Sequence, residues 1–360
     1  MTWTPPPPRS THPYFMHDSI YAQPGALRLV TRPNTAALEG AADRLRAMDH
    51  VILCGIGTSW HASLVGELLL AQVGALGHRA RAFHSFELAS YWPPPAAKTG
   101  VIAVSHRGSK RFSQAALARA KSEGGVAIAL TGKGAAKLGD AEFTLVTVDQ
   151  ENSVAHTASY TTTLALLVTL ASAVGRNDAM AHAMDPVPDQ LALLLGQESW
   201  EDLAKKFGER RRYFFVGGGP NTATAYEAAL KMTEASYTSA TGFNCEQFLH
   251  GAYAAMTAED LLVLITPPGP SRARCVDAAR VAKAIGTPVL VLAPEDDREL
   301  AELATEVIAL PEVDELLSPI LAIVPLQLLA YHIAVRRGVN PDIMRADEAS
   351  YARANEHVKL

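Results

Sequence analysis

Two halves of this 360-residue chain repeat one plan of strands and turns, and this repeat restricts the possible folds more than any other feature. In each half an apolar strand runs into a glycine turn, at Gly55 and at Gly217. A second turn follows 50 residues later at Ser105 and 49 residues later at Thr266. The next apolar strand begins 21 residues after Ser105 and 22 residues after Thr266. Two copies of one α/β unit are the simplest explanation.

Strands alternate with helices within each copy. Apolar runs in the first copy predict strands at 50–54, 81–83, 101–104, 126–130 and 143–148. Helices are expected around them, the first at 35–48 and the last at 159–174. This alternation predicts an α/β fold, with two tandem, doubly wound parallel sheets. The predicted divisions are an N-terminal arm (1–34), a first domain (35–178), a second domain (195–340) and a C-terminal tail (341–360).

The composition argues against several classes of function. A net charge of -5 gives no reason to expect a nucleic-acid partner. The three cysteines, Cys54, Cys245 and Cys275, lack the spacing of a metal site and form no disulfide framework. They therefore indicate a reducing, cytoplasmic compartment and no bound metal. The glycine turns differ from G-x-G-x-x-G, so we expect no dinucleotide and no other cofactor.

No stretch is expected to enter a membrane. The N-terminus, with its run from Pro5 to Pro8, is too polar and proline-rich for a signal peptide and is expected to form a polyproline-type arm. The apolar run 161–174 is shorter than the roughly 20 residues that a bilayer requires. A longer run, 317–335, is interrupted by Pro319 and Pro325. Both runs predict core helices.

Turns rich in hydroxyl groups and free backbone amides follow two strands of the first half. They are Gly57-Thr58-Ser59 and the segment from Ser105 to Lys110. Such turns at helix N-termini bind anions, although glycine and serine are also ordinary turn and cap residues. The matching turn of the second half, 266–270, reads Thr-Pro-Pro-Gly-Pro, and its prolines have no N–H to donate. The sequence predicts a single anion site, in the first half, with phosphate as the favoured ligand.

A charged helix face is the main feature of the second half. Residues 222–237 are rich in helix formers, and offsets of four and three place Glu227, Lys231 and Glu234 on one face. An ordinary surface ion pair worth about 0.3–0.5 kcal/mol is one interpretation. The other is a ligand site, because the helix follows a strand and a glycine turn, and ligands bind at the carboxyl ends of strands in open α/β sheets.

In combination these residues resemble the SIS (sugar isomerase) family. They are most similar to the isomerase half of glucosamine-6-phosphate synthase and to its glucosamine-6-phosphate deaminase and fructosamine-6-phosphate deglycase relatives. The resemblance covers residues 13–341 and implies two SIS domains, each a flavodoxin-like three-layer sandwich. The motifs that carry it are Gly57-Thr58-Ser59, Ser105-His106-Arg107-Gly108-Ser109, residues 151–161, Glu227-x3-Lys231-x2-Glu234, His250-Gly251 and residues 324–332.

The resemblance implies a sugar-phosphate substrate and a role for each motif. Glu234 is expected to move a proton between C1 and C2, with Glu227 and Lys231 beside it. His250 is expected to open the sugar ring from the neighbouring subunit of a homodimer; a satisfied buried histidine is the alternative. The residues expected to hold the sugar phosphate are Gly57, Thr58, Ser59, Ser105, His106, Arg107, Ser109, Lys110 and Val154.

The residues themselves agree with this chemistry. Proton abstraction beside a carbonyl needs a carboxylate with a raised pKa and a cation for the developing oxyanion, and the Glu-Lys-Glu face offers both.

Three departures from the family pattern stand out. The family's phosphate loop reads Ser-x-Ser-Gly-x-Thr, whereas Arg107 and Lys110 replace its second serine and its threonine. These cations could grip a phosphate more strongly, select another anionic group or a sugar of different size, or face solvent. His156 stands where a small hydroxyl residue is usual. The tail differs from the synthase ending, so Lys359 is not assigned the Schiff-base role of the synthase tail lysine.

The sequence therefore predicts a cofactor-free enzyme acting on a sugar 6-phosphate such as fructose 6-phosphate or glucosamine 6-phosphate. Position 2 is threonine rather than a cysteine nucleophile, and no glutaminase domain is expected. Isomerisation, deamination or deglycation is thus expected rather than glutamine-dependent amination by this chain alone. A non-catalytic phosphosugar sensor is the competing interpretation. Against it, the first 34 residues are too short and proline-rich for a DNA-binding domain, and a pure sensor has no need of the Glu-Lys-Glu face.

Overall fold

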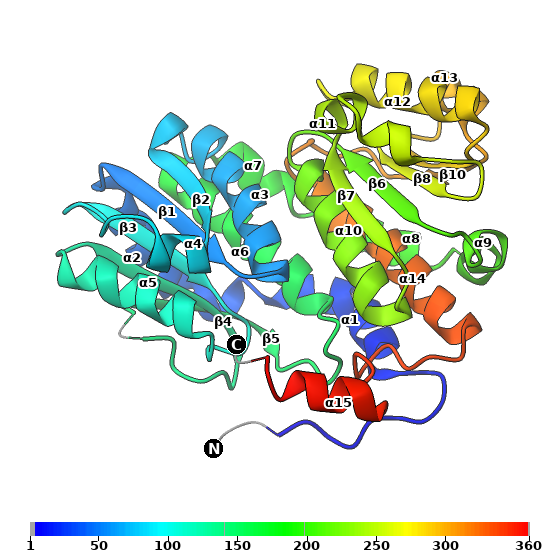
Figure 1. Cartoon of the computed structure of the whole chain (residues 1–360). Coiled ribbons are helices and arrows are strands. Elements are labelled where there is room, and N and C mark those ends of the chain that lie inside the picture. Colours follow the sequence, from blue (N-terminus) through cyan, green and yellow to red (C-terminus); the bar gives the residue numbers. More distant parts are fainter. Residues whose placement is uncertain (1–3, 140, 198, 359–360) are drawn as a thin grey trace.

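Each half of the chain forms a five-stranded parallel sheet, and helices fill the space between the two sheets (Figure 1). The computed structural model describes residues 4–139, 141–197 and 199–358, so Lys359 lies outside the described residues. The strand order is β2-β1-β3-β4-β5 in the first lobe and β7-β6-β8-β9-β10 in the second. The two orders are the same when each is numbered within its own lobe, and they match the flavodoxin-like order 2-1-3-4-5. The predicted fold class is confirmed.

The elements of the first lobe follow the predicted runs closely. Its strands are β1 (His50–Gly55), β2 (Ala80–His84), β3 (Thr99–Val104), β4 (Val126–Lys133) and β5 (Phe143–Asp149). Its helices are α2 (Thr35–Arg46), α3 (Thr58–Gln72), η2 (Gly77–Arg79), α4 (Ser85–Ser90), α5 (Arg111–Ser122) and α6 (Ala158–Gly175).

The second lobe repeats this series. Its strands are β6 (Tyr213–Gly217), β7 (Ala240–Asn244), β8 (Leu261–Ile265), β9 (Val289–Ala293) and β10 (Glu306–Ala309). Its helices are α10 (Asn221–Ser236), α11 (Cys245–Leu249), η3 (Ala252–Ala255), α12 (Arg272–Ile285), α13 (Arg298–Leu303) and α14 (Ser318–Arg336). Between the lobes lie α7 (Asp178–Ala183), α8 (Val187–Leu195) and α9 (Trp200–Phe207).

One continuous core joins the two lobes. Side chains alternate along each strand, so Ile102 of β3 faces inward with α2, α3 and α6, whereas Val101 faces the outer layer with α4 and α5. In the second lobe Phe215 of β6 faces inward with α10 and α14, and Phe214 faces α11 and α12. The inward faces of both sheets belong to the same buried cluster, while each outer face has a separate one. The lobes therefore pack through their inner helices.

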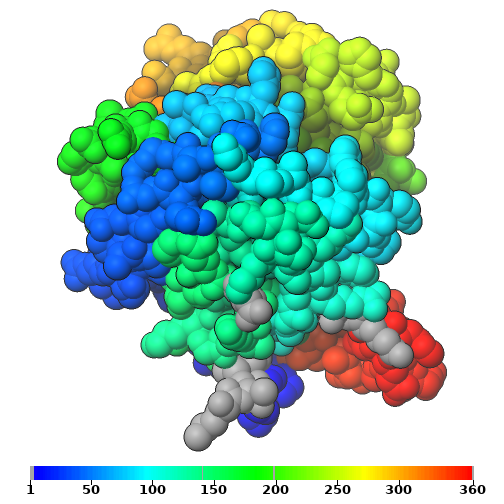
Figure 2. Space-filling view, turned by 90° about the vertical axis from the view of Figure 1, so that its left-hand side faces the viewer, coloured from blue at the N-terminus to red at the C-terminus, as the bar shows by residue number. Residues whose placement is uncertain are grey.

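The segment 1–34 contains a helix that the sequence analysis did not predict. Helix α1 (Phe15–Leu29) packs against α6, α8 and α14, and η1 (Arg32–Asn34) follows it. Asp342, which follows α14, accepts hydrogen bonds from the amides of Phe15 and Met16 at 2.8 and 2.9 Å. Helix α15 (Ala349–Asn355) contains no buried residue and projects from the body of the molecule (Figure 2).

Helices α6 and α14 are long and apolar enough to cross a membrane by length and composition alone. Core helices pass the same test. Within the stretches that pass this test, 83% of the α6 stretch and 94% of the α14 stretch are buried inside the protein. Both are core helices, as the sequence predicted.

Candidate active site

Helix α10 carries the predicted charged face into the interface between the lobes. It packs against α3, the helix at the equivalent place in the first lobe. Tyr226 of α10 stacks on Trp60 of α3, with ring centroids 6.2 Å apart and planes 7° apart. The side chains of Glu227 and Lys231 are 0% and 1% exposed. The interpretation as a surface ion pair is therefore wrong.

Glu227 links the two lobes through its carboxylate. Its Oε1 accepts a hydrogen bond from the Thr58 hydroxyl at 2.9 Å, and its Oε2 lies 2.7 Å from Nδ1 of His61. The Lys231 ammonium lies 3.4 Å from Oε1. Sequence analysis did not single out His61, although its position three residues after Thr58 places both on one face of α3. That spacing was the available signal.

The two carboxylates on this face are shifted in opposite directions. Burial by itself would raise the pKa of Glu227, but Lys231, His61 and the Thr58 hydroxyl together bring that pKa below its ordinary value. Burial raises the pKa of Glu234, Lys231 offsets part of this effect, and the charge of Glu227 adds to it. Although burial disfavours its charge, the pKa of Lys231 is raised by Glu234 and Glu227. Two titratable groups driven apart in this way are typical of acid–base assignments in active sites.

The two polar turns lie at the carboxyl ends of β1 and β3, where they were expected. Gly57 has φ of +57°, a left-handed conformation that favours glycine, and it directly precedes α3. The Thr58 hydroxyl, expected to hold phosphate, is instead engaged by Glu227. Ser105 is 2% exposed, and its hydroxyl has no hydrogen-bond partner among the described residues. A buried hydroxyl of this kind is suited to a ligand oxygen.

The pocket beside these turns is small and polar. Its volume is about 10 Å³, which is close to the space that one water molecule needs. Its lining comes from α3, the end of β3 and the start of α6: Thr58, Ser59, Ala62, Val104, His106, His156, Ser159, Tyr160 and Thr163. Within the described part of the chain, no group of three or more His, Cys, Asp and Glu is placed to hold a metal ion.

The second turn carries two cations, Arg107 and Lys110. Arg107 and Lys110 are half-buried, whereas Ser109 is exposed. Burial lowers the pKa of Arg107, with Glu151 opposing the shift. Burial also lowers the pKa of Lys110, and the charge of Arg107 lowers it further. The interpretation that these residues merely face solvent is therefore weakened, because both cations are partly withdrawn from water.

Glu151 organises the start of α6. Its carboxylate accepts hydrogen bonds from the amides of Thr157 at 3.0 Å and Ser159 at 2.8 Å. Burial opposes its charge, but His156, His106 and Ser159 lower the pKa of Glu151 to about 2. Burial lowers the pKa of His156 to about 3 and also lowers that of His106. The two rings meet edge to face with centroids 4.9 Å apart. Because both pKa values are lowered, the two rings pack as neutral partners at neutral pH.

Two predicted residues lie away from the charged face. Val154 is half-buried, and its amide donates to the Asp342 carbonyl at 3.1 Å, which ties its loop to the segment after α14.

His250 follows α11, and its side chain is 67% exposed. Its Nδ1 lies 2.9 Å from the Glu246 carbonyl oxygen. Among the described residues, no hydrogen bond or ion pair joins His250 to the α10 face, so the alternative of a satisfied buried histidine is wrong.

In the second lobe, the side chain of Glu315 occupies the place that corresponds to the space between the anion turns of the first lobe. The Glu315 carboxylate lies against both turns: a Cβ on Gly269 would be 2.4 Å from its Oε1, and a Cβ on Gly219 would be 3.4 Å away. Gly219, with φ of +53°, corresponds to Gly57. Burial raises the pKa of Glu315, and Asp314 adds to the shift. An anion here would meet a carboxylate in addition to prolines that have no N–H to donate. This is a second reason to expect a single anion site, in the first lobe.

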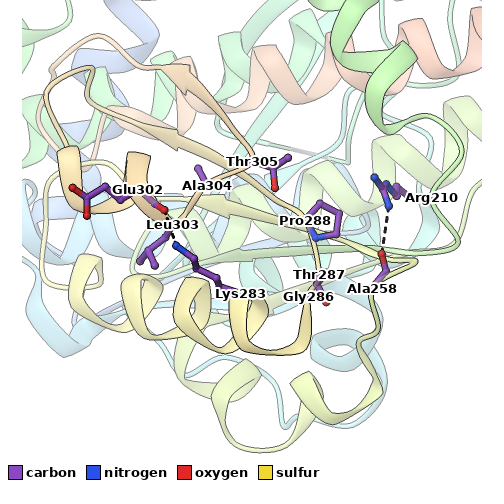
Figure 3. Close-up of a pocket in the computed structure, with 10 residues that line it drawn as sticks. All are labelled: Arg210, Ala258, Lys283, Gly286, Thr287, Pro288, Glu302, Leu303, Ala304 and Thr305. Carbon is purple, nitrogen blue, oxygen red and sulfur yellow. Dashed lines mark hydrogen bonds between the residues drawn. The ribbon is translucent and has the colours of Figure 1, made fainter.

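A larger hollow of about 490 Å³ lies at the opposite edge of the second sheet (Figure 3). It is lined by residues near the starts of β6, β8, β9 and β10 and by α12 and α13: Arg210, Ala258, Lys283, Gly286, Thr287, Pro288, Glu302, Leu303, Ala304 and Thr305. Lys283 and Arg210 already donate to the carbonyls of Glu302 and Ala258, at 3.0 and 3.4 Å. Because ligands of open α/β sheets bind at the carboxyl edge, we place the candidate site at the α3–α10 interface.

Comparison with known proteins decides the family. The family model described as the SIS domain matches residues 44–173 and 206–337, one match in each lobe. The chain belongs to the SIS-domain family.

Relatives of known name match most of the length of this chain. Glutamine–fructose-6-phosphate aminotransferase (isomerizing) from Thermococcus kodakarensis is 34% identical over 351 residues, covering 93% of this chain and 57% of that protein. The chain thus spans little more than half of this curated relative.

Solved structures show the same SIS fold. The C-terminal domain of glucosamine-fructose-6-phosphate aminotransferase from Francisella tularensis superposes with a TM-score of 0.80 at 18% identity, covering 92% of this chain and 98% of that one. Tagatose-6-phosphate ketose/aldose isomerase from Escherichia coli gives 0.79 at 19% identity, covering 95% and 97%.

The buried charges on α10 make a prediction about stability. Replacing Lys231 by methionine leaves two carboxylates without their cation, so Lys231→Met should lower the free energy of unfolding by about 3–5 kcal/mol. Adding Glu227→Gln should recover part of this loss, because one uncompensated charge is removed. Urea unfolding of the two single variants and the double variant measures the coupling.

The matched control is Lys205→Met, at an exposed lysine of α9. It should change stability by no more than about 0.5 kcal/mol. Equal effects of Lys231→Met and Lys205→Met would show that the buried ammonium does not hold the lobes together.

Proposed function

We propose that this chain is a cofactor-free enzyme that moves a proton between C1 and C2 of a sugar 6-phosphate, interconverting aldose and ketose forms. The buried Glu227–Lys231–Glu234 face carries the proposal: the Lys231 ammonium pairs with both carboxylates, and the opposite pKa shifts of Glu227 and Glu234 separate an ionised, lobe-bridging carboxylate from a proton-transfer carboxylate. Neither shift is needed to bind a ligand without reaction, which favours an enzyme over a sensor.

Each residue of the site has a role in this reaction. Glu234 takes the proton from the carbon beside the carbonyl and returns it to the neighbouring carbon. Lys231 remains protonated and offsets negative charge that develops on the substrate oxygen. Glu227, held by Thr58 and His61, fixes Lys231 in place.

The anion turns of the first lobe are proposed to hold the phosphate. Ser105 offers a buried hydroxyl that has no hydrogen-bond partner among the described residues, and Ser59 lies in the first turn of α3. Arg107 and Lys110, both half-buried, supply positive charge from the same turn as Ser105. Fructose 6-phosphate and glucosamine 6-phosphate fit this class of substrate. Deamination and deglycation of such a substrate are also consistent with this site, since both reactions require proton transfer beside a carbonyl or imine carbon.

His250 is proposed to act on the site of a neighbouring subunit. In one chain its imidazole is exposed and forms no hydrogen bond or ion pair with the α10 face among the described residues. A two-fold dimer can bring such a side chain to the partner's site, because the same patch of each subunit then faces the other.

Glu234→Gln tests the proposed base. Glutamine keeps the size of the side chain but cannot accept the proton, so exchange at C1 or C2 should fall at least about 1,000-fold while ligand binding persists. Proton NMR in heavy water with fructose 6-phosphate, glucosamine 6-phosphate and fructosamine 6-phosphate measures exchange and identifies the preferred substrate. Glu123→Gln, at an exposed glutamate, is the control. Full exchange in Glu234→Gln would remove Glu234 from the reaction.

The raised pKa of Glu234 predicts the acid limb of the pH profile. A base must be deprotonated, and a pKa above the ordinary value means that protonation begins at higher pH than for an exposed glutamate. At saturating substrate, kcat should therefore decline as the pH falls through a pKa above about 4.3. An acid limb at or below that value would contradict the assignment.

Mixing two inactive variants tests the shared site. If His250 serves the partner's site, Glu234→Gln and His250→Ala chains coexpressed with different tags should form mixed dimers that contain one intact site. Random pairing then restores about one quarter of wild-type activity. The control pair, Glu234→Gln with Glu227→Gln, should restore none, because these residues belong to one site. No recovery in the first pair would place His250 in its own chain's site or outside the reaction.

A further inference from the structure

Tyr160 has a buried hydroxyl that nothing in the described structure satisfies. It is the third residue of α6, its side chain is 1% exposed, and Oη has no hydrogen-bond partner among the described residues. Burial raises the pKa of Tyr160 well above 10, and the negative charge of Glu227 adds to the shift. Tyr160 is therefore a neutral O–H donor throughout the physiological range.

An unpaired hydroxyl of this kind is costly in a packed interior, so native structures rarely retain one without a reason. Tyr213 provides the contrast within the same chain. It is equally buried, and its hydroxyl donates to the Phe207 carbonyl at 2.7 Å. A partner for Tyr160 is thus expected outside the described residues.

The place of Tyr160 indicates what that partner is. Tyr160 lines the small polar pocket together with Thr58, Ser59 and His106. The pocket admits about one oxygen-sized group rather than a whole sugar. Apart from Ala62 and Val104, its other walls are hydroxyl and imidazole groups, which suit a polar occupant.

The lining of this pocket distinguishes between the oxygens of a sugar phosphate. Arg107 and Lys110, the cations that suit a phosphate, are not among the residues that line it. The negative charge of Glu227 adds to the pKa shift of Tyr160, and Lys231 offsets that charge from 3.4 Å. With no Lys or Arg in its lining, the pocket suits a neutral hydroxyl or carbonyl oxygen better than a doubly charged phosphate.

The geometry points to Tyr160 as a substrate-binding residue that donates a hydrogen bond to a hydroxyl or carbonyl oxygen of the sugar chain, between the anion turns and the Glu227–Lys231–Glu234 face. This assignment rests on the proposed function. It adds a specificity contact that reads the sugar and not the phosphate.

Tyr160→Phe tests the assignment in the full chain, with two readouts that differ from those of a structural tyrosine. Without ligand, the variant should unfold at the same or a higher urea concentration than the wild type, because an unpaired hydroxyl is removed. Its Kd for fructose 6-phosphate or glucosamine 6-phosphate, whichever the wild type binds, should rise about 5–30-fold. Its Kd for inorganic phosphate should not change.

Tyr213→Phe is the matched control. It removes a buried hydroxyl that has a partner, so it should lower the urea midpoint and leave the affinity for the sugar phosphate unchanged. Calorimetric titration measures the affinities of wild type and both variants under the same conditions.

Each remaining outcome overturns a stated idea. Unchanged sugar-phosphate affinity in Tyr160→Phe, or a lowered urea midpoint like that of Tyr213→Phe, overturns the assignment alone and leaves the proposed function intact. Equal losses of affinity for sugar phosphate and inorganic phosphate show that the hydroxyl binds the anion, which also overturns it. A wild-type protein that binds none of these compounds overturns the proposed function and the assignment together.

Discussion

The buried carboxylate of Glu227 is the interaction on which the rest of the site depends. It lies where α3 and α10 cross, and it takes one partner set from each lobe: Thr58 and His61 from the first, Lys231 from the second. An ionised carboxylate in a packed interior is tolerated only when its charge is paired and its oxygens are hydrogen-bonded. The lobes must therefore meet in one orientation, and that orientation places the anion turns of one lobe beside the charged helix of the other.

The internal repeat explains why such a meeting is possible. Helices α3 and α10 follow equivalent strands, β1 and β6, so they lie at equivalent places in the two sheets. Packed against each other, they turn the carboxyl edges of both sheets toward a common interface. The two edges have diverged: the first keeps hydroxyl turns, with the buried Ser105 hydroxyl unpaired among the described residues, and the Glu315 carboxylate lies against the turns of the second. One lobe is suited to an anion and the other contributes the proton-transfer face.

Burial has opposite consequences for neighbouring groups in this interface. Glu227 is as buried as Lys231, yet three partners keep it ionised, whereas Glu234 has a raised pKa because one ammonium cannot fully offset its burial and the charge of Glu227. His106 and His156 are neutral because burial outweighs the attraction of Glu151. The arrangement concentrates charge on a few groups and leaves the surrounding pocket neutral and polar.

Much of the fold could be predicted from local pattern, because strands and helices of an α/β unit have short periods. The runs 50–54 and 101–104 are almost the observed β1 and β3, and the predicted helix 222–237 is α10 to within one residue at each end. Helix α1 was not predicted, since Pro24 lies inside it and obscures the helical pattern. Its position depends on the distant carboxylate of Asp342 at its first turn.

The sequence by itself determined the repeat, the α/β class and the group Glu227, Lys231 and Glu234 on one helical face, because these follow from spacing along a chain of known periodicity. Only the tertiary structure decided that this face is buried, that His61 and Thr58 bind Glu227 across the lobes, and that the hydroxyl of Tyr160 lacks a partner among the described residues. The physical reason is that burial and hydrogen-bond satisfaction arise from residues more than 160 positions apart, and spacing within one element carries no information about them.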